Sequence, residues 1–267
     1  MCLPPGRSGA TLKFKLLDWP GFRVIATFTD FSNQGPYLGQ VKAVLQELVP
    51  NIPVVDVFPD LPACNVKAAA YLLPAYSQYL MAGSVCLCVV DPGVGTGRRA
   101  VALHIDERWY VGPDNGLFSM LLRRAKKIQA YEITWRPDRL SSSFHGRDLF
   151  APVCARLTGG HRTEDWADEL SPDRLVIPAW PEDLLEVVYI DSYGNAVTGL
   201  RAAVISEGMR LEIAGQQCVY QRVFAEAHNG VAFWYENANG LVEIAVPGGS
   251  AQDSLGIATG DALSLVE

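Results

Sequence analysis

Apolar runs and segments of helical spacing alternate along the first ninety residues. The runs 22–28, 53–58 and 85–90 have the length and the flanking residues of buried strands. Between them, residues 37–49 repeat an apolar face at helical spacing. A second helix is predicted over 65–80, where an asparagine can cap the first turn. The order strand, helix, strand, helix, strand predicts a parallel sheet with right-handed crossovers.

Similar patterns continue to about residue 160. Strands are predicted over 100–105, 109–111 and 130–134, and helices over 117–125 and 147–157. Together with the first five elements they predict an α/β domain over residues 22–175. Residues 1–21 match no such pattern and are interpreted as a variable N-terminal extension.

The residue pattern changes after residue 160, where prolines and acidic residues become frequent. Residues 176–184 are predicted to be a linker, and residues 185–267 a second domain. In this domain, short alternating segments with turn residues between them favour a small β-barrel or a sandwich. The predicted strands are 186–190, 203–205, 210–213, 217–223, 230–235 and 241–246.

Composition narrows the classes of protein to consider. The chain of 267 residues is 49% apolar, which is sufficient for packed cores, and its net charge of −7 without a Lys/Arg-rich block argues against a nucleic-acid partner. No segment resembles a membrane span, and the apolar stretch 12–17 is too short and too charged for a signal peptide. Six cysteines without a C-x-x-C pair and four histidines without zinc-like spacing predict reduced thiols and no metal site. We therefore expect a cytoplasmic protein.

Polar residues concentrate in four loops that follow predicted strands or precede a predicted helix. They are Asp30 with its neighbours, 91–98, Asp114 with Asn115, and 145–148. In a parallel sheet the carboxyl ends of the strands lie at one edge, where ligands bind. Several of these loops are therefore expected to converge, as an active site requires.

Taken alone, each of these residues has a structural interpretation as well as a functional one. Asp30 can accept hydrogen bonds from a ribose diol, and it can equally form a turn or a helix cap. Asp91 and Arg98 can form a charge-assisted pair, for which a structural salt bridge is the more frequent interpretation. The glycines at 93, 95 and 97 form neither a Walker motif nor a dinucleotide fingerprint, so phosphate binding is weakly supported.

The remaining candidates are weaker still on their own. A lone histidine such as His145 is more often structural than catalytic, although its charged neighbours favour an ordered position. The segments 191–195, 237–240 and 248–250 are most simply interpreted as turns.

In combination, six motifs in this order resemble the S-adenosylmethionine hydrolase family, also called SAM hydroxide adenosyltransferases, which are relatives of fluorinase and chlorinase. The resemblance spans roughly residues 22–265. The motifs are Thr29-Asp30-Phe31 with Pro36-Tyr37, Val90-Asp91-Pro92-Gly93-Val94-Gly95, Pro113-Asp114-Asn115-Gly116-Leu117, Phe144-His145-Gly146-Arg147-Asp148, Ile190-Asp191 with Tyr193-Gly194-Asn195, and Gly248-Gly249-Ser250-Ala251.

This resemblance implies a fold class, an assembly and a reaction. The fold is α/β, with a Rossmann-like N-terminal domain that has a mainly parallel sheet and a C-terminal small β-barrel. The assembly is a homotrimer whose ligand lies between the N-terminal domain of one subunit and the C-terminal domain of its neighbour. The reaction is hydrolysis of S-adenosylmethionine to adenosine and L-methionine, with no metal or redox cofactor.

The resemblance also assigns roles to individual residues. The catalytic set is Asp91, Arg98 and His145, and Asp30 is the acid that binds the ribose. Residues Asp191, Tyr193 and Asn195 meet the methionine and adenine portions. The other implied substrate-binding residues are Tyr37, Phe144, Gly146, Ala238, Asn239, Val246 and Gly248.

Alternative functions remain open at this stage. A halogenase is disfavoured because its branch of the family carries a tyrosine at the position of Asp91, and has a long insertion where this chain joins Ile105 to Tyr110 by a short turn. A non-catalytic adenosine-binding or S-adenosylmethionine-binding protein would not need the full catalytic set. One departure from the family is that Cys64-Asn65 replace an aromatic–acid pair near the sugar. A purely structural interpretation of every loop is the remaining alternative.

Overall fold

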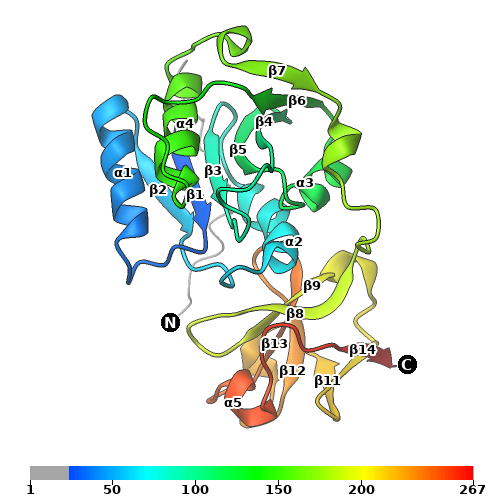
Figure 1. Cartoon of the computed structure of the whole chain (residues 1–267). Coiled ribbons are helices and arrows are strands. Elements are labelled where there is room, and N and C mark those ends of the chain that lie inside the picture. Colours follow the sequence, from blue (N-terminus) through cyan, green and yellow to red (C-terminus); the bar gives the residue numbers. More distant parts are fainter. Residues whose placement is uncertain (1–23, 267) are drawn as a thin grey trace, which may run out of the picture.

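The computed structural model describes residues 24–266. The predicted N-terminal extension, the start of the first predicted strand at Phe22 and the terminal Glu267 lie outside these residues. The first three strands, β1 (Ile25–Thr29), β2 (Val54–Phe58) and β3 (Val85–Val89), are parallel and lie in the order β2-β1-β3. The helices between them are α1 (Tyr37–Leu48) and α2 (Val66–Ser77), so the predicted alternation is confirmed (Figure 1).

The other half of this sheet is antiparallel. Its strands β4 (Ala100–Ile105), β5 (Arg108–Pro113), β6 (Ile128–Ile133) and β7 (Ala167–Leu170) complete the order β2-β1-β3-β5-β4-β6-β7. Strand β5 is parallel to β3, and the β5–β4, β4–β6 and β6–β7 pairs are antiparallel. The expectation of a mainly parallel sheet is therefore wrong for this half.

A tight turn explains the change of direction. Asp106 and Glu107, which join β4 to β5, both have positive φ, 44° and 69°. A connection this short can only reverse the chain, because a parallel crossover needs a dozen residues or more. Strand β7 was not predicted, because its sequence Ala-Asp-Glu-Leu is polar and only its first residue is buried.

Helices cover both faces of this sheet. Helices α2 and α3 (Ser119–Arg124) pack on one face, and α1 and α4 (Ala151–Thr158) pack on the other. In β3 successive side chains alternate between the two cores, so the whole strand is buried. This double burial explains why the sequence of the strand is a continuous apolar run. A π-helical turn, Gly146–Phe150, leads directly into α4.

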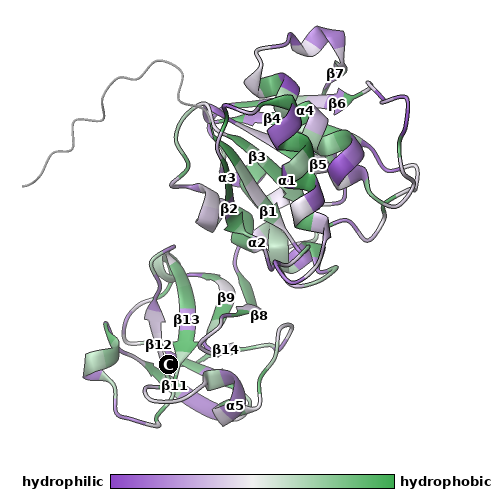
Figure 2. Ribbon diagram, turned by 90° about the vertical axis from the view of Figure 1, so that its left-hand side faces the viewer, coloured by the Kyte–Doolittle hydropathy of each residue, from purple (hydrophilic) through white to green (hydrophobic). Residues whose placement is uncertain are grey.

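The second sheet is formed by the C-terminal part of the chain. Its strands are β8 (Leu184–Ile190), β9 (Ala196–Arg201), β10 (Arg210–Ile213), β11 (Gln216–Tyr220), β12 (Phe233–Glu236), β13 (Leu241–Ala245) and β14 (Ser264–Val266), with helix α5 (Ala251–Leu255) before β14. They lie in the order β14-β10-β11-β12-β13-β9-β8. Leu263 N donates to Leu185 O at 3.0 Å and Val187 N to Asp261 O at 2.9 Å, which joins β8 to the segment before β14 and curls the sheet. Hydrophobic residues concentrate in the central strands, such as β3 of the first sheet and β13 of the second (Figure 2).

Several predictions for this region need correction. The strand predicted over 203–205 is a 3₁₀ turn, Ala202–Val204, and the strand predicted from residue 230 begins at Phe233. Strand β9 was missed because a glycine interrupts its apolar pattern. A Cβ atom on Gly199 would lie 2.7 Å from Cβ of Leu184, so close packing of β8 on β9 requires this glycine. Short 3₁₀ turns also occur at Thr163–Asp165, Pro172–Leu175 and Phe224–Glu226.

Side chains of helix α2 contact the segment that leads to the second sheet and the first strand of that sheet, β8. The Tyr71 hydroxyl donates to the Pro181 carbonyl, and Lys67 Nζ lies 2.7 Å from Glu186 Oε1 on β8. Residues 24–266 contain no helix that is long and apolar enough to cross a membrane.

Candidate active site

The loop that follows β3 contains a buried ion pair. Arg98 Nε donates to Asp91 Oδ1 at 2.7 Å, and Arg98 Nη2 donates to Asp91 Oδ2, so the pair is bidentate. The two side chains are only 9% and 5% exposed. The Arg98 guanidinium also lies 5.3 Å from the ring centroid of Phe150. A bidentate pair in a site with little water has a well-defined geometry.

His145 completes this cluster. Its Nδ1 lies 3.2 Å from Arg98 Nη2. A guanidinium can only donate, so Nδ1 accepts and the proton of the neutral ring is on Nε2. Burial lowers the pKa of His145 below its ordinary value, and the positive charge of Arg98 lowers it further. The geometry and the electrostatics therefore both favour a neutral imidazole whose N–H faces away from Arg98.

Close contact between two loops brings the cluster together. Gly95 has φ +81°, and a Cβ atom there would lie 2.3 Å from the Ser142 carbonyl oxygen. Only glycine fits this position, which lets the loop after β3 pack against the loop that contains His145. A cavity of about 390 Å³ borders Arg98, Ser142 and His145. The glycine therefore serves loop packing rather than phosphate binding.

Asp30 lies beside this cluster. Because Thr29 pairs with Val89 in the parallel β1–β3 ladder, the residues that follow the two strands emerge at the same edge. Cys64 N donates to Asp30 Oδ2 at 2.9 Å. Burial raises the pKa of Asp30, the Cys64 bond opposes this, and the charge of Asp91 adds to it. The predicted convergence of strand ends is confirmed for these acids.

An aromatic cluster borders the same edge. The ring centroids of Tyr37 and Phe144 are 5.3 Å apart, and those of Phe31 and Phe144 are 5.6 Å apart. A Cβ atom on Gly146 would lie 2.9 Å from Phe31 Cζ, so this glycine permits the close packing. Tyr37 is 52% exposed. The rings can therefore present an apolar surface to a flat ligand.

A second group of predicted residues lines a pocket of about 520 Å³ in the C-terminal sheet. The predicted members are Asp191, Tyr193, Asn195, Val246 and Gly248. Asp191 Oδ1 accepts from Tyr193 N at 2.9 Å and from Asn195 N at 2.8 Å, so its carboxylate shapes the loop. Tyr193 is 79% exposed.

Four further residues of this pocket were not predicted as site residues, namely Phe224, Tyr235, Glu243 and Gly249. Glu243 is buried and accepts hydrogen bonds from the Tyr235 hydroxyl and from Asn237 Nδ2, the latter at 2.9 Å. A single acidic residue in the apolar strand β13 was the signal that could have identified it, because a carboxylate is buried only when it has partners.

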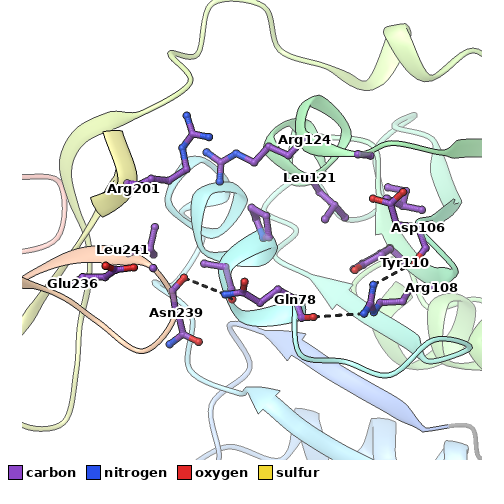
Figure 3. A pocket seen from close by; sticks show the side chains of 16 residues that line it. Gln78, Asp106, Arg108, Tyr110, Leu121, Arg124, Arg201, Glu236, Asn239 and Leu241 are labelled. Atoms are coloured by element: carbon purple, nitrogen blue, oxygen red, sulfur yellow. Dashed lines mark hydrogen bonds between the residues drawn. The ribbon is translucent and has the colours of Figure 1, made fainter. Parts of the chain in front are cut away.

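Two predicted residues lie elsewhere. The carbonyl of Ala238 accepts from the Tyr79 hydroxyl at 2.9 Å, and that of Asn239 accepts from Gln78 Nε2 at 3.1 Å. Asn239 borders a separate cavity of about 420 Å³ between α2 and the β12–β13 hairpin (Figure 3). The turn of this hairpin, which contains Ala238 and Asn239, therefore contacts the end of α2, whereas its strands contribute Tyr235 and Glu243 to the pocket of Asp191.

The two groups of predicted residues belong to different parts of the chain. The cavity beside His145 is lined by the N-terminal sheet and its loops, and the pocket with Asp191 is lined by the C-terminal sheet and its loops. Within residues 24–266 no group of three or more His, Cys, Asp or Glu side chains could hold a metal ion.

Comparison with known proteins identifies the family. The family model described as the SAM hydroxide adenosyltransferase N-terminal domain matches residues 25–167, and that of the C-terminal domain matches residues 185–264. The chain belongs to the SAM hydroxide adenosyltransferase family. The cluster of Asp91, Arg98 and His145 lies within the first matched region, and the pocket of Asp191 lies within the second.

Relatives with known names support this assignment. The chain is 40% identical over 256 residues to the (R)-S-adenosyl-L-methionine hydrolase of Thermus thermophilus, covering 89% of this chain and 97% of the relative. It is 37% identical to the enzyme of the same name from Salinispora arenicola, covering 90% and 96%. A fluorinase from Actinoplanes sp. is 24% identical and covers 61% of this chain and 63% of its own length.

Solved structures agree with these relationships. An uncharacterized conserved protein from Thermotoga maritima superposes with a TM-score of 0.81 at 27% identity, covering 91% of this chain and all of the other. A conserved hypothetical protein from Thermus thermophilus superposes with a TM-score of 0.74 at 37% identity, with the same coverage.

Proposed function

We propose that this protein hydrolyses S-adenosyl-L-methionine to adenosine and L-methionine. The observation that carries the proposal is the buried Asp91–Arg98–His145 cluster, which is held together by a bidentate ion pair and a 3.2 Å contact. Three relatives that are 36–40% identical to this chain are named (R)-S-adenosyl-L-methionine hydrolase, and each match covers about nine tenths of the chain.

The chemistry of the substrate determines what the protein must supply. The sulfonium is a good leaving group, because sulfur takes the electron pair of the C5′–S bond and becomes the neutral thioether of methionine. Water is a weak nucleophile. Its oxygen must lie in line with the C5′–S bond, and it must lose a proton as the O–C5′ bond forms. This displacement needs no redox cofactor, because no electron leaves the reacting pair of molecules, and no metal, because the thioether leaves as a neutral molecule.

The cluster can orient and activate this water. Asp91 uses one lone pair on each oxygen for Arg98 and retains others that can accept the proton of a water molecule. His145 Nδ1 accepts from Arg98 Nη2, which helps to hold the guanidinium and, through it, Asp91 in place beside the water. Arg98 stabilises the developing hydroxide by its positive charge. A dry site favours the step further, because hydroxide and sulfonium neutralise each other in the transition state.

Other residues would bind the substrate. Asp30 accepts hydrogen bonds from the ribose hydroxyls, and the rings of Tyr37 and Phe144 border the same edge. The pocket with Asp191, Tyr193, Asn195, Val246 and Gly248 receives the methionine and adenine portions. Each chain carries the Asp91 cluster and the Asp191 pocket as two separate half-sites. A complete site therefore forms where the Asp91 half-site of one subunit meets the Asp191 half-site of its neighbour, as in a homotrimer.

The proposed organisation keeps the predicted boundaries. Residues 22–175 form an N-terminal domain, 176–184 a linker and 185–267 a C-terminal domain whose curled sheet approximates a barrel. The hydrogen bonds that connect β8 to the segment before β14 support this description. The five cysteines among the described residues are free thiols, in keeping with a cytoplasmic enzyme.

Incubation with S-adenosyl-L-methionine in ¹⁸O-labelled water tests the reaction. We expect equal amounts of adenosine and methionine, with the label in the 5′-hydroxyl of adenosine and no 5′-halogenated nucleoside in the presence of chloride or fluoride. Mass spectrometry of the nucleoside measures both. Binding without turnover would instead support a non-catalytic sensor, and a 5′-halogenated product would support a halogenase.

Complementation between two inactive variants tests the shared site. We expect Asp91→Asn and Asn195→Ala to be poorly active alone, and a mixture that is unfolded and refolded together to regain activity. In a mixed trimer some interfaces combine two intact halves, so the activity rises above that of either variant. Light scattering measures the assembly. A monomer, or a mixture no more active than its components, would overturn the shared site.

A further inference from the structure

Cys64 has a backbone conformation that is unusual for its residue type. Its φ is +57°, in the left-handed region. It is the third residue of a turn in which Asn65 N donates to Pro62 O at 3.1 Å. Glycine or asparagine normally occupies such a position, because a side chain there crowds the following carbonyl. Strain of this kind persists only where the surroundings impose it, and it is frequent at functional sites.

The neighbouring residue fixes the turn from the other side. Asn65 is the N-cap of α2, and its Oδ1 accepts from Ala68 N at 3.0 Å. Residue 64 is therefore held between a closed turn and a capped helix. Its peptide N–H is directed away from both and towards a segment 34 positions earlier in the chain, where it donates to Asp30 Oδ2 at 2.9 Å.

Asp30 needs such a donor. Burial raises the pKa of its carboxyl, the Cys64 N–H lowers it, and the charge of Asp91 raises it again. The hydrogen bond to Cys64 N is thus a main influence that favours the charged carboxylate, and it also leaves the orientation of that carboxylate well defined. Within residues 24–266, Cys64 is the one other residue that donates a hydrogen bond to this carboxylate, so Oδ1 can accept from a ligand.

We infer that Cys64 is a positioning residue for substrate binding: its left-handed backbone directs the N–H that orients Asp30 towards the ribose hydroxyls. This inference rests on the proposed function, in which Asp30 binds the ribose. The residue is exposed, and its bond to Asp30 comes from the backbone N–H and not from the thiol. Because the ribose is held alike before and during the reaction, the residue acts on affinity more than on turnover.

A series of substitutions at residue 64 separates conformation from side-chain chemistry. We expect Cys64→Gly and Cys64→Asn, which tolerate positive φ, to bind adenosine as the parent does. Cys64→Val has a branched side chain that disfavours positive φ, so its Kd for adenosine should rise about tenfold, the order of effect expected when a charge-assisted hydrogen bond is weakened. Calorimetry measures Kd, and steady-state kinetics should show the change in KM with kcat little altered.

Two controls make the inference specific to the ribose. With 2′,3′-dideoxyadenosine, which lacks the hydroxyls, the parent and Cys64→Val should bind equally. In an Asp30→Asn background, Cys64→Val should add no further loss, because the two residues act through one interaction. Melting temperatures report whether each variant is folded.

The outcomes distinguish the inference from the function on which it rests. If Asp30→Asn binds adenosine as tightly as the parent, the role of Asp30 in ribose binding is wrong. If Asp30→Asn binds weakly while a folded Cys64→Val binds normally, the role of Cys64 is overturned. An equal loss for adenosine and for the dideoxy compound would also overturn it, because that pattern indicates general distortion of the loop.

Discussion

Replacing Asp91 by Asn is expected to lower kcat for S-adenosyl-L-methionine hydrolysis by about 10³-fold, within the range that positioned acid–base groups contribute. The substitution removes the proton acceptor for the water. It also replaces one carboxylate oxygen by an NH₂ group, which cannot accept a hydrogen bond. The carboxylate accepts two bonds from Arg98, one from Nε at 2.7 Å and one from Nη2, so one of them is lost. Chromatographic measurement of adenosine release gives the rate.

A second ion pair in the same chain provides the control. Arg201 donates to Asp183 through Nε at 2.7 Å and through Nη2 at 2.6 Å, the same bidentate arrangement in a place remote from His145. Asp183→Asn should reduce the melting temperature about as much as Asp91→Asn does, and it should retain most of the activity. If the two variants lose activity equally, the effect of Asp91 is one of stability, and the proposed role fails.

The parallel half of the first sheet could be predicted from the sequence because local signals agree there. The run at 85–90 is apolar on both faces, and helices with clear spacing separate it from its parallel neighbours. The antiparallel half was missed, although the short turn between the predicted strands 100–105 and 109–111 already requires the chain to reverse there. What no local pattern indicated is the pairing of β4 with β6 and of β6 with β7, which lie far apart in the sequence.

The candidate site was predictable to the extent that strand ends determine it. Asp30 and Asp91 follow neighbouring parallel strands, so topology brings them together. His145 lies in a loop whose position depends on packing at Gly95, and only the family resemblance connected it to Asp91 and Arg98 in advance. Their mutual contacts now agree with that connection.

The C-terminal pocket was the least predictable part. Its shape depends on long-range pairing of short strands, which local patterns specify weakly. Glu243 was overlooked because its importance comes from partners on a neighbouring strand and turn, Tyr235 and Asn237. Conversely, Ala238 and Asn239 were assigned by resemblance, yet their carbonyls bind residues at the end of α2 and beyond it.

The pH dependence of kcat/KM is expected to report His145. Its pKa lies below the ordinary value of about 6.5, so the ring is neutral at pH 7 and activity should fall only as the pH drops below that value. The sign follows from the contact with Arg98: a protonated ring has no acceptor for Arg98 Nη2 and adds a second positive charge beside it, which disrupts the cluster. The same depressed pKa means that stability from this group is present above the ordinary value and is lost as the pH falls through the lower one.

Substitution of His145 should remove this dependence along with most of the rate. We expect His145→Ala to lower kcat by about 10²-fold to 10³-fold and to abolish the acidic limb assigned to the ring. His104 is a suitable control, because it lies on β4, bonds to Gln129 at 3.2 Å and packs against Trp109, away from Arg98. His104→Gln should keep both the rate and the profile. An acidic limb that persists unchanged in His145→Ala would show that another group controls it, and the neutral imidazole would then have no part in activating the water.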